Sequence, residues 1–249
     1  MSRLLVLLLT LMIVPGGALH AQGDDAAPES LFSGPVISAE SASLLVQVAA
    51  LEGHTMAAAG VAFHPDGALL ASTSHDVGLR LWSLPGGESL AELFTHISLV
   101  KGVAFNPDGD LLATGSWDRT VAIHDVSPEG DIELRDVSAP FSAVVEPVAF
   151  SPDGALIAAG VGDGRVVLLD VVTLDEVRAY PVPGPEITAL AFSPDGDLLL
   201  MAGGFPDDTA QMWPVDDTSS EPLALLDGHR GSVMGIAVYP LADDGGGDP

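Results

Sequence analysis

The chain has 249 residues, with 35 acidic and 8 basic side chains, a net charge of −27 and no cysteine. The missing cysteine excludes disulfides and cysteine-ligated zinc. Nucleic acids and anionic membranes bind basic patches, so neither is expected as a partner of so acidic a chain.

The first 21 residues have the pattern of a secretory signal peptide. A basic start at Arg3 is followed by an apolar stretch over residues 4–14 and then by small residues, with cleavage expected after Ala21 or Ala18. The apolar stretch is short for a membrane span. We therefore expect a secreted or cell-envelope protein without stable membrane insertion after cleavage; an uncleaved anchor is the alternative.

Residues 22–36 contain Gly, Pro and acidic residues and are expected to form a flexible linker. An apolar stretch over Leu44–Leu51 follows, which we interpret as a strand. The same kind of stretch precedes each of the repeats described next, so this strand would be an outer strand that comes before the first of them.

A seven-residue motif then occurs four times: an apolar residue, Ala, Phe, any residue, Pro, Asp and Gly. The copies begin at Val61, Val103, Val148 and Leu190, and a degraded copy begins at Ile236. Their prolines are residues 65, 107, 152, 194 and 240. A period of about 40–45 residues is typical of four-stranded propeller blades.

Each copy predicts strands joined by tight turns. In the first, Val61 and Phe63 would face the same side of an inner strand, and Pro65-Asp66-Gly67 form a turn. Three further strands are expected there, at Leu69–Ser74, Leu79–Trp82 and Ser89–Phe94. The equivalent second and third strands of the later copies are Asp110–Ser116, Val121–Asp125, Leu156–Val161, Val166–Asp170, Leu198–Gly203 and Ala210–Trp213.

The repeats resemble the WD-repeat (Trp-Asp repeat) β-propeller family over residues 43–240. Gly53-His54 opens the first repeat, and Trp82-Ser83 stands at the Trp-Asp position. The resemblance implies an all-β fold, a WD-repeat β-propeller with four complete four-stranded blades plus a partial blade. The propeller would span residues 37–240, with repeats at about 54–95, 96–138, 140–182 and 183–228, a partial repeat at 229–240 and a disordered tail at 241–249.

The partial blade would have two of its four strands, an outer one from Leu44–Leu51 and an inner one from Ser232–Tyr239. We interpret the chain as a truncated copy of a longer propeller. The alternatives are a small ring that closes on itself and completion by another chain.

The resemblance also implies a structural tetrad of His, Ser or Thr, Asp and Trp in each blade. Its members here would be His54, Ser72, Asp76 and Trp82 in the first repeat and His96, Thr114 and Asp118 in the second, with Asp163 in the third and Trp213 in the fourth. His124 replaces the Trp of the second repeat. In the third, Phe141 and Leu169 replace the His and the Trp.

His54, His96 and His229 recur at equivalent junctions, but a three-histidine metal site is not expected. Equivalent positions in successive blades are related by rotation, so their side chains diverge. The Asp-Gly-Asp turns at 108–110 and 195–197 lack the remainder of a calcium loop. No metal and no cofactor is therefore expected.

In the family, partners commonly contact the turns between the second and third strands. Carried over, this implies a partner-binding rim that includes His75, Trp117 and Phe205. We expect a non-enzymatic protein–protein interaction scaffold that binds a protein or peptide. The alternatives are a metal-dependent propeller hydrolase or lactonase, and a fragment without independent function.

Overall fold

The computed structural model describes residues 50–182, 186–203, 209–216, 221–229 and 231–238. All of them belong to one structural unit, Val46–Pro249. The expected signal peptide, linker and tail lie outside the described residues, and so does Phe205.

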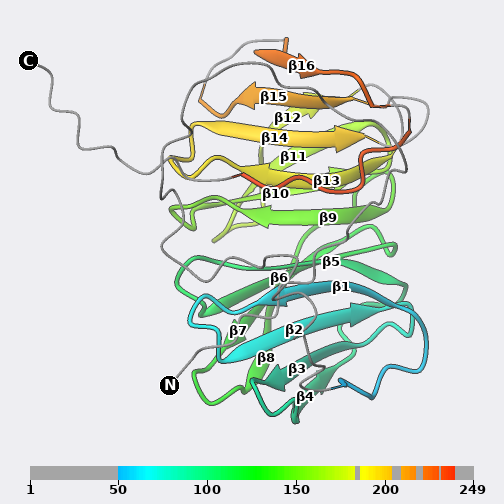
Figure 1. Ribbon diagram of the computed structural model, residues 1–249, viewed down its shortest axis with the longest axis vertical. Helices are drawn as coiled ribbons and strands as arrows, with labels where there is room; N and C mark the ends of the chain where they lie inside the picture. The colour runs from blue at the N-terminus through cyan, green and yellow to red at the C-terminus, as the bar shows by residue number, and fades with distance from the viewer. Residues whose placement is uncertain (1–49, 183–185, 204–208, 217–220, 230, 239–249) are drawn as a thin grey trace, which may run out of the picture. The chain divides into compact units, whose positions relative to one another are not determined.

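Sixteen strands make up the regular structure of the described residues (Figure 1). The first sheet contains β1 (Ala58–Phe63), β2 (Leu69–Ser74), β3 (Leu79–Ser83) and β4 (Ser89–Leu93). The second contains β5 (Val100–Phe105), β6 (Leu111–Ser116), β7 (Val121–Val126) and β8 (Ile132–Val137). The third contains β9 (Val145–Phe150), β10 (Leu156–Val161), β11 (Arg165–Asp170) and β12 (Glu176–Pro181). The fourth contains β13 (Ile187–Phe192), β14 (Leu198–Gly203), β15 (Ala210–Pro214) and β16 (Ala224–Leu226).

Each sheet is an antiparallel meander in which neighbouring strands follow one another in the sequence. The inner strands β1, β5, β9 and β13 lie beside one another in this order. The described residues contain no helix, and none that could cross a membrane. The predicted all-β propeller with four four-stranded blades is confirmed.

The Pro-Asp-Gly turns connect the first and second strands of each blade. In the first blade, the amide of Gly67 donates to the carbonyl of His64 at 2.9 Å, and Gly67 has a φ of 76°. Only glycine adopts this conformation without strain. The carboxylate of Asp66 accepts the Ala68 amide at 2.7 Å, which fixes the turn from its other side. The repeated sequence therefore sets where each second strand begins.

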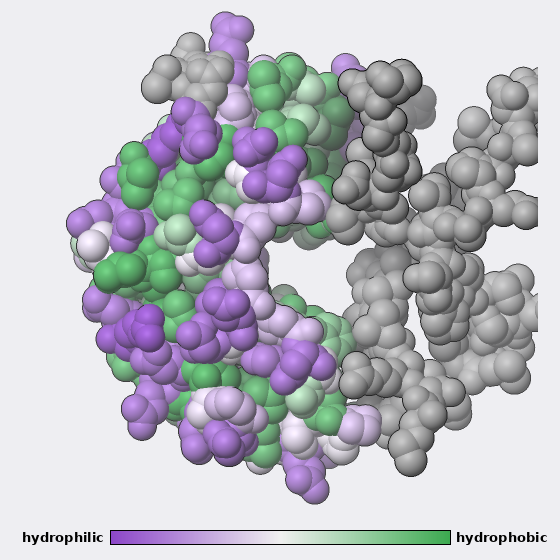
Figure 2. Space-filling view, turned by 90° about the vertical axis from the view of Figure 1, so that its left-hand side faces the viewer, coloured by the Kyte–Doolittle hydropathy of each residue, from purple (hydrophilic) through white to green (hydrophobic). Residues whose placement is uncertain are grey.

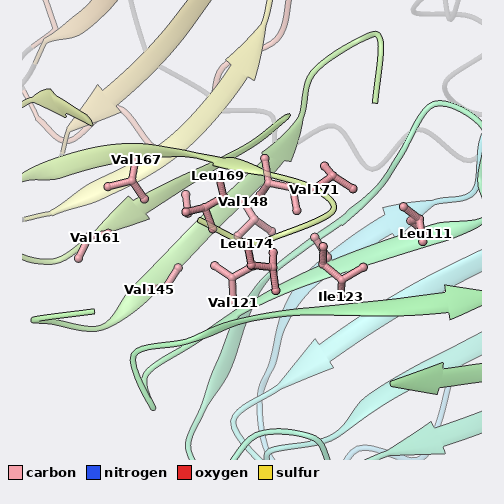
Figure 3. Close-up of a cluster of buried hydrophobic side chains, with 13 residues drawn as sticks. Leu111, Val121, Ile123, Val145, Val148, Val161, Val167, Leu169, Val171 and Leu174 are labelled. Carbon is pink, nitrogen blue, oxygen red and sulfur yellow. The ribbon is translucent and has the colours of Figure 1, made fainter. Parts of the chain in front are cut away.

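Neighbouring blades pack face to face through apolar side chains. Between the second and third blades, Val121 and Ile123 of β7 meet a cluster that includes Val145 and Val167 (Figure 3). These four side chains are fully buried. Burial of each such side chain contributes about 1.5–3 kcal/mol, and truncation of Ile123 to Ala would cost about 2–5 kcal/mol.

The partial fifth blade differs from the prediction. Residues 231–238, the described part of the expected inner strand Ser232–Tyr239, form no strand. Of the expected outer strand Leu44–Leu51, only Ala50 and Leu51 are described, and both are exposed and irregular. A strand is held by its ladder partners, and residues 231–238 have no ladder partner in the part of the chain that the structure describes.

Figure 2 views the molecule from the end at which β2 and β14 begin. Hydrophilic residues are spread over this end, with hydrophobic patches between them. The turns between second and third strands, and the loops between blades, lie at the opposite end, because strand direction alternates within each sheet. That opposite end carries the candidate site.

Candidate protein-interaction site

The first blade brings its four tetrad residues together. The indole of Trp82 donates to the Ser72 hydroxyl at 2.8 Å, and that hydroxyl lies 2.8 Å from Nε2 of His54. Nδ1 of His54 lies 3.1 Å from a carboxylate oxygen of Asp76. Since Nδ1 faces a carboxylate, it carries the proton, and Nε2 accepts from Ser72. These bonds fix the loop that precedes β1 against β2.

Asp76 is the anionic end of this network. Partial burial disfavours its charge, but hydrogen bonds from the amides of Thr55 and Gly78 and from His54 outweigh burial and lower the pKa of Asp76 to about 2. The carboxylate therefore stays charged and holds the turn between β2 and β3.

The second blade repeats the arrangement with one replacement. His96 lies 2.9 Å from both Thr114 Oγ1 and Asp118 Oδ2. His124, at the Trp position, is fully buried; its Nδ1 donates to the Leu112 carbonyl at 3.2 Å, and its Nε2 lies 3.0 Å from Thr95 Oγ1. Burial lowers the pKa of His124 to about 4, so the ring is neutral near pH 7. Thr95 was not predicted as its partner.

In the third and fourth blades, residues outside the predicted tetrad supply the hydrogen-bond partners of Asp163 and Trp213. Asp163 accepts hydrogen bonds from the Ser142 hydroxyl and from the Arg165 guanidinium, since Phe141 replaces the histidine. The buried indole of Trp213 donates to Gln211 Oε1 at 2.9 Å. Ser142 and Gln211 were not predicted. A buried N–H or carboxylate needs some partner, and nearby polar residues supply it here.

Trp117 occupies the turn between β6 and β7 and is 41% exposed. Its indole N–H donates to Oε1 of Glu146, in β9 of the next blade, at 2.9 Å. The ammonium of Lys101 lies 5.5 Å from the centre of the indole ring and 3.0 Å from the same carboxylate oxygen. A cation at this distance from a ring is favourable. The ring is thus both exposed and held by two neighbouring blades.

Further apolar side chains are exposed at this end of the first two blades. Ile97 is 91% exposed, and its amide donates to Asp118, the residue after Trp117. Phe94 and Met56 are 64% and 59% exposed, in the loops that precede β5 and β1. We call Met56, Phe94, Ile97 and Trp117 the rim surface. In the sequence, each of the first three is only an apolar residue within two positions of His54 or His96. This signal does not distinguish exposed from buried side chains.

The other predicted rim residue that the structure describes is His75. It is half-buried in the turn after β2, and its amide donates to the Ala57 carbonyl at 3.0 Å. Among the described residues, no group of three or more His, Cys, Asp or Glu side chains is arranged to hold a metal ion. His54 and His96 bond within their own blades, and His229 is exposed.

The repeats identify the family of this chain. The family model "WD domain, G-beta repeat" (WD40) matches residues 45–83, 87–125, 147–170 and 176–214, more than half of the chain. The chain therefore belongs to the WD40 repeat family, whose domains commonly act as protein-interaction scaffolds and are generally not catalytic. No curated protein matches the chain.

Proposed function

We propose that this chain is a non-enzymatic scaffold that binds a protein or peptide partner through the rim surface. The observation that carries the proposal is Trp117, an exposed aromatic ring fixed by a hydrogen bond to Glu146 and by Lys101. Tryptophan is enriched among the residues that dominate binding energy at interfaces.

Fixed geometry lowers the cost of binding. Ordering a mobile side chain at an interface costs about 0.5–1.5 kcal/mol. Trp117 is already held by Glu146, so less of this cost remains. The exposed Ile97, whose amide donates to Asp118, adds apolar area next to the turn that carries Trp117. Exposed apolar area on soluble proteins marks interaction sites.

Affinity capture with the full chain tests the proposal. Proteins bound by the wild type are compared with those bound by Trp117→Ala and by the control Leu134→Ala, a 49%-exposed residue of the outer strand β8. We expect partners that are lost at least tenfold with Trp117→Ala and retained with Leu134→Ala. Equal capture by both variants would contradict the proposal.

We also propose that the chain is exported through residues 1–21, on the basis of their basic, apolar and small-residue order. The mass and N-terminal sequence of the chain recovered from its own cells test this. We expect an N-terminus at Gln22 or Leu19 in an extracytoplasmic fraction. A chain that retains Met1 in the cytoplasm would refute export.

A further inference from the structure

Residues 231–238 lie where the inner strand of a fifth blade would lie. The segment, drawn in red, runs beside β13 (Figure 1), and the Thr188 hydroxyl of β13 donates to the Val233 carbonyl. Val233 is 8% exposed and packs against Ala202 and Ala210. The first residues of the inner strands β5, β9 and β13 are buried in the same way: Val100, Val145 and Ile187.

The backbone of this segment is almost unpaired. In the complete blades, the inner strand forms a ladder with the second strand, as β5 does with β6. Within 231–238, the Val233 carbonyl is the only backbone group that bonds to any described residue. The segment therefore presents a row of backbone N–H and C=O groups that no described residue pairs, and this open edge is a template for pairing with another strand.

The adjoining face of the fourth blade is partly uncovered. Leu198 and Leu200 of β14 and Met212 of β15 are half-buried. The residues at the same repeat positions of the first blade are covered by the second blade: Leu69 is 4% exposed, and Ala71 and Leu81 are fully buried. The open edge and the uncovered face are the places that a second and a third strand would fill.

We propose that residues 231–238 and this face of the fourth blade form a docking site for a β-hairpin of another polypeptide chain. The first strand of the hairpin would pair with the open edge, and its apolar face would cover Leu198, Leu200 and Met212. This is β-strand addition, in which main-chain hydrogen bonds give affinity and side-chain pockets give specificity. A hairpin that fits this site would have a sequence like that of β2 and β3. Its first strand would contain leucine-class and small residues, and a tight turn would lead into a second, alternating strand.

A second copy of this chain fits the site less well. Its own inner strand β1 would need the place that residues 231–238 already hold. Two chains of charge −27 also repel one another. Compared with a second copy, a hairpin of a different chain that is neutral or basic in charge fits the site better, and it is the occupant that we propose.

A synthetic hairpin tests the proposal with the full chain. Residues 155–171 form β10 and β11 and carry leucine-class and small residues, a tight turn and then an apolar strand, with a net charge of −1 from Asp163, Arg165 and Asp170. With two lysines added at each end, this peptide is compared with a scrambled peptide of the same composition. We expect saturable binding of the hairpin alone, and amide hydrogen exchange at 232–238 slowed at least tenfold. Equal exchange with both peptides would overturn the proposal.

Two variants locate the binding. Leu200→Asp places a charge on the uncovered face and should weaken hairpin binding at least tenfold; Leu134→Asp, on the outer strand β8, should leave it unchanged. Equal binding by both variants overturns the proposal. Because Leu200→Asp could unfold the blade, the exchange experiment on the wild-type chain stands independently of it. A dimer in light scattering with 232–238 already protected would assign the edge to a second copy and overturn the proposal.

Discussion

The indole of Trp117 and the carboxylate of Glu146 form a 2.9 Å hydrogen bond across the boundary between the second and third blades. Glu146 lies at the start of β9, and it also pairs with Lys101 of β5. The orientation of the exposed ring therefore depends on how two blades pack, not on its own turn alone.

Removal of this carboxylate should weaken partner binding without unfolding the chain. Glu146→Ala leaves Trp117 in place but frees its indole, so the ring must be ordered again upon binding. We expect a several-fold loss of affinity for the captured partner, smaller than that for Trp117→Ala, and a change in the free energy of unfolding below about 1 kcal/mol. Titration calorimetry and urea denaturation measure the two quantities. Unchanged affinity would mean that Glu146 does not position the ring.

The Ser72 hydroxyl should be a stabilising group. Ser72→Ala leaves the buried indole N–H of Trp82 without its acceptor, which costs about 1–3 kcal/mol. Ser72→Thr is the matched control, because it retains a hydroxyl and the second blade has Thr114 at this position. Urea denaturation should show a lower midpoint for the alanine variant alone. Equal midpoints for both variants would show that the hydroxyl contributes nothing.

His124 should make the fold sensitive to mild acid. Its pKa in the folded chain is about 4, below the value of about 6.5 for an unfolded histidine. Between these pH values the unfolded state binds more protons, so the free energy of unfolding falls as pH falls, by about 3 kcal/mol in all. His124→Phe should remove that part of the decline.

Urea denaturation at several pH values between 7 and 4.5 measures the slope. His96 faces His124, and burial lowers its pKa too, so part of the decline remains in the variant. Asp118 and Asp125 are the nearby acids. The exposed His229→Phe is the control and should behave as the wild type. A His124→Phe variant with the wild-type slope would contradict the assignment.

Substitution by alanine should destabilise the chain at Gly102 but not at Gly235, which has the equivalent position in the last repeat. A Cβ atom at Gly102 would lie 2.1 Å from the Glu146 carbonyl oxygen of the next blade, whereas one at Gly235 would have nothing within 4 Å. Overpacking costs about 1–3 kcal/mol. Gly102→Ala should therefore lower the melting temperature, while Gly235→Ala changes stability by less than about 0.5 kcal/mol. Similar melting temperatures would argue against this close packing of inner strands.

The strands were predictable where the sequence has sharp borders. β2, β10 and β14 have the predicted bounds, because each is an apolar or small-residue run between two turns. β1 begins at Ala58, three residues before the predicted start. Residues 58–60 are small and show no alternation, and their pairing with β2 includes an irregular register. Residues 58–60 therefore belong to β1 because they pair with β2, not because their own sequence indicates a strand.

The site was predictable only in part. Trp117 could be selected because the family resemblance places its turn on the partner-binding rim. Its bond to Glu146, however, joins residues 29 positions apart in different blades. Ile97 resembles any buried isoleucine in the sequence, and its exposure follows from the path of the loop. Gln211 became the partner of Trp213 because the fourth blade has Met201 where the first has Ser72. Such contacts depend on three-dimensional packing.

Site-specific photo-crosslinking tests the rim surface most directly. A photoreactive phenylalanine analogue is placed at position 117 or, as the control, at position 134, and the full chain is irradiated with its captured partner. If the partner binds the rim surface, we expect a covalent adduct from position 117 and none from position 134. An adduct from position 134 alone, with none from position 117, would contradict binding at the rim surface.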